Sequence, residues 1–536
     1  MFTRKQWLIL AALLIVAATF RIAVAHWLPN DGPDDGRVYA QMARNLLEQH
    51  IFSHDAQAPY EPSLIRLPGY PLFLAGVYSI FGHTSNGAVR IVQAVIDTAT
   101  CGLIALLAFY WQPDQKKKYV SALGALALAA VCPFTTIYAA TILTEVITNF
   151  LMIAMLVIVT LAFRLSTTED TEEKQNKKAW KPFLWWIIAG LIGGLNVFFR
   201  PDSGLFVAAV GLTLAITGLM RFRREFGGAI VKGAIFSIAF LIVLTPWTIR
   251  NWRVFHQFQP LAPAHGEMPG EFVPRGYYLW LRTWLDDESY IAPFLWSLDT
   301  DPIDIDDVPP YAFDSPDEKK RVTTLLEAYN NEQDTDTDAD ADSKPDNNSN
   351  PDEDKDESDN GKDDSQNNPD QAQPDSDQKP QVEMTPQIDA AFGQLARERI
   401  ARHPFRFYAQ LPLKRAHTMW FDTHSQYWPF VGTLLPFSDL DHTTHQQIWL
   451  PLFAGLTAVY TLLGLAGMWF LWSSGSFDAR RWLLLVVLAI VLRLILFSAI
   501  ENPEPRYVVE FFPLLSVLGG IAIGKFKPRM NADRRR

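Results

Sequence analysis

The dominant pattern along the chain is a series of long apolar blocks separated by polar segments. Each block is roughly 18 to 25 residues long, the length that an α-helix needs to cross the hydrocarbon of a bilayer. Blocks of this length predict helices rather than the alternating strands of a barrel. The pattern therefore predicts an all-α polytopic membrane protein with about ten transmembrane helices, at residues 7–28, 88–111, 119–140, 142–163, 183–199, 203–220, 234–250, 448–472, 482–500 and 507–524.

Basic residues on the connecting segments predict how these helices are oriented. If the helices alternate in direction, all the basic clusters fall on one side, which the positive-inside rule assigns to the cytoplasm. Both termini are then cytoplasmic, and residues 29–87 and 251–447 face outward, as does the turn after Arg200. The clusters are Arg4 with Lys5, Lys116–Lys118, Lys174–Lys181, Arg221–Arg224, Arg480 with Arg481, and Arg534–Arg536.

The first apolar block also resembles a secretory signal, because Ala23-Val24-Ala25 could serve as a cleavage site. Arg21 interrupts its apolar run, and many more helices follow, so an uncleaved first helix is favoured. Nothing in the sequence resembles a signal for retention in the endoplasmic reticulum. We therefore expect the plasma membrane, and a bacterial inner membrane in particular, with the outer segments on the periplasmic or extracellular side.

The composition predicts three parts of the chain. Residues 331–381 hold 18 of the acidic residues and almost no apolar side chains, which predicts a disordered insertion and accounts for the formal charge of −11. A membrane domain is expected at 1–250, with the first outer loop inside it. A small, mainly helical extracytoplasmic region at 251–447 contains the insertion, and residues 448–536 form the last spans and a basic cytoplasmic tail.

The first outer loop carries two adjacent carboxylates, Asp34 and Asp35, immediately after the first apolar block. Tyr39 follows Asp35 by four residues, and apolar residues continue at helical spacing, which predicts an amphipathic helix at 36–49 lying on the membrane. The structural alternative is that both acids cap this helix, where they meet free N–H groups and the positive end of the dipole. The catalytic alternative depends on the residues that accompany them.

Four arginines fall at or just beyond the outer ends of predicted spans: Arg66, Arg200, Arg250 and Arg506. Any one of them could simply extend its guanidinium to the membrane interface. Four at the same level of the bilayer favour a phosphate site, because the donors of a guanidinium match phosphate oxygens. Glu145, at the turn between the third and fourth blocks, adds a carboxylate, which could equally be a solvated turn residue.

Ionisable residues inside the apolar blocks need partners, because burying an unpaired charge in lipid is unfavourable. Arg21 and Asp97 lie at similar depths, so we predict a structural ion pair between them. Arg493 has the same need and no obvious partner. In the loop after the seventh block, His265 and Glu267 are weaker candidates for substrate contact.

No metal or cofactor site is evident from spacing. The histidines are scattered, and both thiols, Cys101 and Cys132, lie within apolar blocks, so no zinc cage is predicted. The alternating aspartates of the acidic insertion lack the turn glycine and closing glutamate of a calcium loop. No cofactor is assigned, a divalent metal is left open, and no nucleic-acid partner is expected.

Six motifs occur in one order along the chain. They are D-G-x-x-Y-x-x-x-A-x-N-L-L from Asp35, R-x-P-G-Y-P-L-F-L-A from Arg66, L-T-E ending at Glu145, R-P-D from Arg200, P-W-x-I-R-N-W from Pro246, and P-R-Y from Pro505. This order resembles the polytopic GT-C superfamily of glycosyltransferases, and within it the protein O-mannosyltransferase and aminoarabinose transferase branch, which is glycosyltransferase family 39-like.

The resemblance implies a sugar donor carried on a polyprenyl phosphate and an acceptor at the outer face, either a glycolipid, a polysaccharide or a protein. By position, Asp35 matches the catalytic acid of the family. Relatives often place glutamate directly after that acid, whereas this chain has Gly36, so Asp34 is the alternative second acid.

We therefore expect an inverting single displacement of a hexose or pentose. Asp35 would act as the base, because it can accept the proton of an acceptor hydroxyl, and guanidinium groups would hold the departing phosphate. Arg66, Arg250 and Arg506 are the phosphate candidates, and Arg200 is a weaker one. Tyr39 and Glu145 would shape the sugar pocket.

Two other functions compete with this prediction. A polytopic transporter of envelope lipids or sugars would also have about ten spans and charges within the membrane. The chain shows no similarity between its halves, and its polar groups gather at the outer surface, which favours the transferase. The second competitor is an assembly protein whose outer region only binds envelope polymers.

Overall fold

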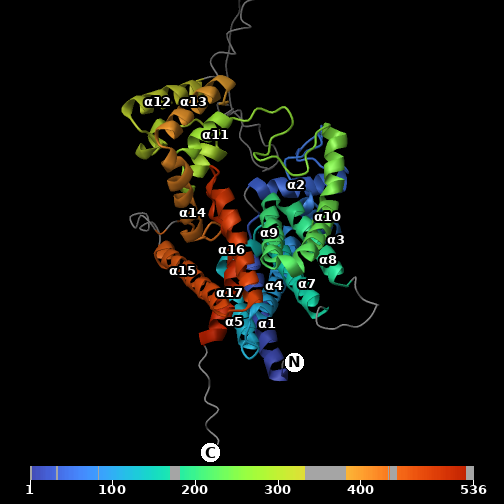
Figure 1. Ribbon diagram of the computed structural model, residues 1–536. Coiled ribbons are helices and arrows are strands. Elements are labelled where there is room, and N and C mark those ends of the chain that lie inside the picture. Colours follow the sequence, from blue (N-terminus) through green and yellow to red (C-terminus); the bar gives the residue numbers. More distant parts are fainter. Residues whose placement is uncertain are drawn as a thin grey trace, which may run out of the picture. The chain divides into compact units, whose positions relative to one another are not determined.

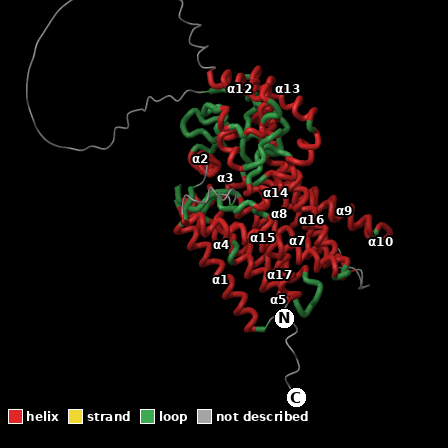
Figure 2. Tube along the Cα trace, turned by 90° about the vertical axis from the view of Figure 1, so that its left-hand side faces the viewer, coloured by secondary structure: helices red, strands yellow, loops and turns green. Residues whose placement is uncertain are grey.

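The computed structural model describes residues 3–526 apart from 32–33, 83, 170–180, 332–381, 433 and 435–443. The described residues form helices and loops, with no β-strand beyond an isolated bridge between Asn30 and Thr141 (Figures 1 and 2). The predicted all-α polytopic class is confirmed. Of the predicted acidic insertion, everything after Asn331 lies outside the described residues, as does the basic tail.

Two compact units make up the chain. The first, here called the membrane unit, combines Met1–Val273 with Pro412–Arg536, and the second, the inserted unit, is Pro274–Leu411. The inserted unit is shorter than the region 251–447 that we assigned to the outer side, because residues on both flanks of that region pack with the membrane unit.

Within the described residues, seven helices of the membrane unit are long and apolar enough to span a bilayer: α1 (Arg4–Trp27), α4 (Asn86–Trp111), α7 (Glu145–Glu169), α9 (Gly204–Met220), α10 (Phe222–Phe255), α15 (Thr444–Ser473) and α16 (Phe477–Ser498). Shorter apolar helices are α3 (Gly69–Phe81), α8 (Lys181–Phe199) and α17 (Phe511–Phe526). The remaining helices are α2 (Asp34–Glu48), α5 (Lys118–Ala130), α6 (Pro133–Thr136) and α14 (Leu411–Phe421).

One predicted span is broken. Residues 119–140 form α5 and then α6 with its 3₁₀ continuation Ile137–Ala139, and the two parts meet at 54°. The break falls at Pro133, which has no N–H to donate to the preceding turn. Counted as one span, this pair brings the spanning helices to eight.

The N-terminal end of α1 and the C-terminal end of α17 lie at the same end of the membrane unit. The Tyr119 hydroxyl donates to the carbonyl of Gln6 at 3.5 Å, and the Lys117 ammonium donates to the carbonyl of Lys525 at 3.4 Å. This geometry places the first and the last described helix ends on one side of the membrane unit. That the side is cytoplasmic stays a prediction.

The predicted ion pair inside the membrane unit is confirmed. Arg21 Nε lies 2.6 Å from Asp97 Oδ2, and both side chains are buried. The rest of the guanidinium donates to carbonyls of Ala129 and Ala130 at the end of α5, at 3.0 and 3.2 Å. Arg21 thus compensates backbone acceptors left open where the span breaks, in addition to the carboxylate.

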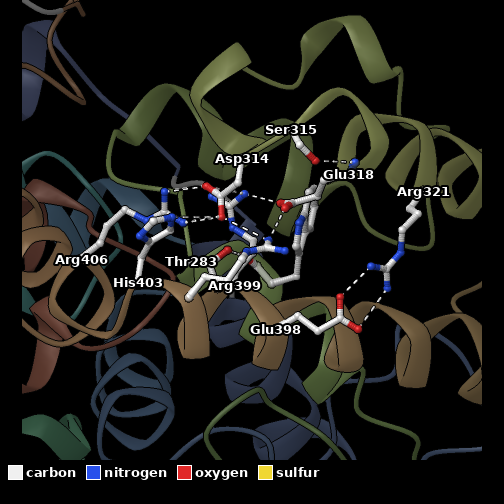
Figure 3. Close-up of polar contacts among 11 residues, drawn as sticks. Thr283, Asp314, Ser315, Glu318, Arg321, Glu398, Arg399, His403 and Arg406 are labelled. Atoms are coloured by element: carbon white, nitrogen blue, oxygen red, sulfur yellow. Dashed lines mark hydrogen bonds and ion pairs between the residues drawn. The ribbon is translucent and has the colours of Figure 1, made fainter.

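The inserted unit contains α11 (Arg275–Arg282), α12 (Pro316–Asn331) and α13 (Pro386–Arg402). Its core is aromatic, with Trp280, Trp284 and Phe392 all buried. An ion cluster joins the start of α12 to the end of α13 (Figure 3). In it, the buried Glu318 binds Arg399 and Arg402.

Breaking this cluster is expected to loosen α12 from α13. Glu318→Gln leaves the guanidinium of Arg399 buried with less compensating charge, which should reduce the free energy of local opening by about 3 kcal/mol. Hydrogen exchange of α12 and α13 measures this opening. Glu398→Gln is the matched control, because its pair with Arg321 at 2.6 Å is exposed, so its effect should stay below about 1 kcal/mol. Equal effects of the two substitutions would contradict the assigned role of burial.

Candidate active site

The predicted amphipathic helix of the first outer loop is α2, and it begins at Asp34. The side chain of Asp34 lies outside the described part of the structure, so its predicted second-acid role stays a prediction. The chain before α2 is held by a hydrogen bond from the Asn30 N–H to the carbonyl of Ala140 at 3.0 Å. This contact fixes the start of α2 against the segment that leads into α7.

Gly36 explains why this chain has no acid directly after Asp35. A Cβ atom at residue 36 would lie 2.9 Å from the carbonyl oxygen of Ile142 and 3.0 Å from that of Asp31. Both obstacles are backbone atoms, which cannot move aside as a flexible side chain would. Only glycine allows α2 to approach the neighbouring segment this closely, so a glutamate here would displace the first turn.

Gly36→Ala is therefore expected to destabilise the protein by about 1–3 kcal/mol and to reduce activity further by shifting Asp35. Thermal unfolding in detergent and the rate of sugar transfer measure the two effects. Gly76→Ala in α3 is the control, because a Cβ at residue 76 meets nothing within 4 Å. A Gly36→Ala protein with the stability and rate of the Gly76→Ala protein would show that the close approach is unimportant.

Asp35 binds two of the four predicted arginines. Its Oδ1 lies 2.6 Å from Nη2 of Arg66, and its Oδ2 lies 3.2 Å from Nη2 of Arg506. Burial by itself would raise the pKa of the Asp35 carboxyl, but the guanidinium groups of Arg506 and Arg66 outweigh burial and hold this pKa below its ordinary value. Asp35 is therefore ionised near neutral pH.

Arg506 is oriented by an acid that sequence reasoning missed. Glu504 Oε2 lies 2.7 Å from Nε of Arg506 in an ion pair, and its Oε1 accepts a hydrogen bond from the Asn502 amide at 2.8 Å. The Glu504 side chain is only 2% exposed. The available signal was the sequence E-N-P-E-P-R-Y, where Glu504 precedes Arg506 by two residues. We call Asp35, Arg66, Glu504 and Arg506 the Asp35 cluster.

Tyr39 lies one turn after Asp35, and its ring contacts Tyr70 edge-on with the ring centroids 5.2 Å apart. Burial raises the pKa of Tyr39 to about 12, and the Asp35 carboxylate adds to the effect. The phenol is therefore protonated at neutral pH. It can donate a hydrogen bond to an acceptor such as a sugar oxygen.

Arg200 is not in the Asp35 cluster. It lies in a separate buried group, here called the Glu145 cluster, in which its guanidinium contacts Glu145 at 2.9 Å, Asp202 at 3.0 Å and Glu510 at 3.2 Å. Since three carboxylates already surround this guanidinium, we leave Arg200 out of the phosphate site. Glu145 is correspondingly bound to Arg200 rather than exposed in a turn.

The Glu145 cluster also supplies the missing partners of Arg493. Its Nη2 lies 2.6 Å from Asp202 Oδ2 and 2.9 Å from Glu510 Oε1. The cluster thus joins the start of α7 and the segments before α9 and α17 to the C-terminal part of α16, with three carboxylates and two guanidinium groups. Neither Glu510 nor the pairing of Arg493 was anticipated from the sequence.

Arg250 does not contact Asp35 but supports the loop that carries Arg66. It donates to the carbonyl of Ser63 at 2.8 Å, and its guanidinium lies 4.9 Å from the ring centroid of Trp247. Its predicted contact with the donor phosphate stays a prediction.

The loop after α10 also reaches the Asp35 cluster. A Cβ at Gly266 would lie 3.2 Å from Nη1 of Arg66, and His265 Nε2 lies 3.1 Å from Glu501 Oε1. The side chain of Glu267 instead accepts from the backbone N–H of His265 at 3.0 Å. This loop therefore joins the segment carrying Arg66 to the segment carrying Arg506.

Among the described residues, no group of three or more His, Cys, Asp or Glu side chains is arranged to hold a metal ion. The described carboxylates of both clusters contact guanidinium groups instead. What the Asp35 cluster can do chemically is accept a proton at Asp35 and stabilise an anion at Arg66 and Arg506.

No family model matches the sequence, and no curated protein matches it. In structure, the chain is similar to the archaeal oligosaccharyltransferase AglB from Archaeoglobus fulgidus, solved with an inhibitory peptide and a dolichol-phosphate, at a TM-score of 0.46 and 11% identity. The match covers 97% of this chain and 50% of AglB, so the chain spans about half the length of that protein.

It is also similar to ArnT from Cupriavidus metallidurans bound to undecaprenyl phosphate, at a TM-score of 0.38 and 12% identity, over 98% of this chain and 79% of ArnT. Both proteins are membrane glycosyltransferases with the GT-C fold, the superfamily that the six motifs resemble. Both TM-scores are below 0.5.

Proposed function

We propose that this protein transfers a sugar from a polyprenyl-phosphate donor to an acceptor at the outer face of a bacterial plasma membrane. One observation supports this most strongly: a carboxylate that can accept a proton lies within 2.6 and 3.2 Å of two guanidinium groups that can hold a phosphate. Three segments that are far apart in sequence meet at this point. They are α2, the loop just before α3 and the segment just before α17.

The reaction needs two kinds of group, and the Asp35 cluster contains both. The acceptor hydroxyl oxygen attacks the anomeric carbon of the sugar while its proton passes to the Asp35 carboxylate. The bond between the anomeric carbon and the phosphate oxygen breaks, and its electron pair stays on the polyprenyl phosphate. Arg66 and Arg506 stabilise the negative charge that collects there. A single displacement of this kind inverts the anomeric centre.

The sugar itself is assigned to the space beside Tyr39. Its protonated hydroxyl can donate to a sugar oxygen, and the edge-on ring of Tyr70 holds it in place. Glu145 contacts Arg200 at 2.9 Å, and its role in the sugar pocket stays a prediction. We propose a hexose or a pentose as the transferred sugar, and a glycolipid, polysaccharide or protein as the acceptor.

Mass spectrometry of envelope lipids and proteins tests the proposal directly. Cells lacking the gene should lose a hexose or pentose from one class of molecule, and the wild-type gene should restore it. A gene encoding Asp35→Asn should not. An unchanged glycan profile with altered distribution of a lipid across the membrane would instead support a transporter.

A further inference from the structure

Both oxygens of the Asp35 carboxylate are engaged, each by a different guanidinium. These are the same two guanidinium groups that the proposed function assigns to the donor phosphate. Counting formal charges, Asp35 and Glu504 balance Arg66 and Arg506, so the resting cluster has no excess positive charge. A phosphate therefore cannot bind here simply by adding to the existing contacts.

We propose that Asp35 is an internal ligand of the phosphate site, which the phosphate group of the donor displaces when it binds. The proposal rests on the proposed function and adds an order of events to it. A carboxylate and a phosphate present similar oxygens to the N–H groups of a guanidinium, so either can make these contacts. Both cannot make them together, because two anions at this distance repel one another.

The exposure of the side chains indicates which contacts can exchange. Asp35 is 25% exposed and Arg66 is 31% exposed, so an incoming phosphate can reach the contact between them. The contact of Arg506 with Glu504 is more enclosed, because Glu504 is only 2% exposed. Arg506 therefore keeps its orientation while Asp35 leaves it, and the guanidinium is ready for a phosphate oxygen.

Displacement by phosphate changes the strength of the Asp35 carboxylate as a base. While bound to two guanidinium groups, the Asp35 carboxylate is a weak base, because both cations stabilise its ionised form. Once phosphate takes its place, Asp35 loses this stabilisation and becomes a stronger base next to the sugar. The donor must therefore bind before an acceptor can be activated, which prevents proton abstraction at an empty site.

The test is the affinity of the full-length protein for undecaprenyl phosphate, measured in detergent by microscale thermophoresis. Asp35→Asn removes the charge of the internal ligand but keeps its shape, so it should bind the lipid about tenfold more tightly than wild type, the effect of losing one charge-assisted competitor. Asp31→Asn is the matched control. It removes a charge from the same segment, but Asp31 contacts Arg90 at 2.5 Å rather than the Asp35 cluster, so its affinity should equal that of wild type.

Arg66→Ala and Arg506→Ala separate this inference from the function on which it rests. If both weaken binding while Asp35→Asn leaves the affinity unchanged or lowers it, the phosphate site stands and the internal ligand is refuted. If neither arginine variant changes the affinity, or no protein binds the lipid, the phosphate site and the internal ligand both fail. If Asp31→Asn and Asp35→Asn raise the affinity for the lipid equally, the gain comes from removing any nearby negative charge. That result also overturns displacement.

Discussion

Asp35→Asn is expected to lower the rate of sugar transfer by about 100- to 10,000-fold, the usual contribution of a general base. Asparagine has nearly the same shape as aspartate but cannot accept the proton of the acceptor hydroxyl. The alkoxide that attacks the anomeric carbon would then have to form without help. The measurement is single-turnover transfer from a radiolabelled polyprenyl-phosphate donor to the natural acceptor, once mass spectrometry has identified it.

Two controls accompany the transfer measurement on Asp35→Asn. Asp31→Asn should transfer sugar at the wild-type rate, because Asp31 lies outside the Asp35 cluster. The Asp35→Asn protein should still bind undecaprenyl phosphate, which shows that it is folded. A rate close to that of wild type would remove Asp35 from the role of base and leave the proposed mechanism without its proton acceptor.

Arg506→Ala is expected to lower the transfer rate by about 100- to 1,000-fold, as the loss of one preorganised donor does elsewhere. Glu504 contacts Nε of Arg506 at 2.7 Å and is nearly fully buried, so it keeps the guanidinium in one orientation when phosphate takes the place of Asp35. Negative charge on the phosphate grows as the bond to the sugar breaks, and a guanidinium fixed in this way stabilises it most in the transition state. The loss should therefore appear in kcat more than in KM.

Arg506→Lys should recover little of this activity. A single ammonium group cannot contact Glu504 and a phosphate oxygen with the planar geometry of a guanidinium. Arg90→Ala is the matched control, because Arg90 pairs with Asp31 outside the Asp35 cluster. If Arg506→Lys were fully active, or if Arg90→Ala were as slow as Arg506→Ala, the directed contact with phosphate would be refuted.

Sequence patterns predicted the local features of the site well. The amphipathic helix at 36–49 is α2, which spans Asp34–Glu48, because its apolar positions recur with the helical period. Arg66 and Arg506 are predicted phosphate residues because both are assigned to the outer level of the bilayer, and both contact Asp35. The pair of Arg21 with Asp97 followed from the unfavourable burial of either charge alone.

The same reasoning failed where pairing depended on segments far apart in sequence. Arg200 has the same predicted position at the outer level of the bilayer as Arg66, yet it lies in the Glu145 cluster with Glu510. Glu504 and Glu510 precede the last helix without any periodic pattern. Which arginine meets which acid depends on how α7, α9, α16 and α17 pack, and apolar periodicity does not encode that packing.

The sequence by itself determined that this chain is an α-helical membrane protein, because in lipid every backbone N–H and C=O must find a partner within its own segment. It also determined that acids and arginines gather near the ends of the helices. Only the tertiary structure decided that these charges form two separate clusters. A charged side chain near the membrane forms an ion pair with the opposite charge that packing brings within about 4 Å. Packing is a property of the whole fold.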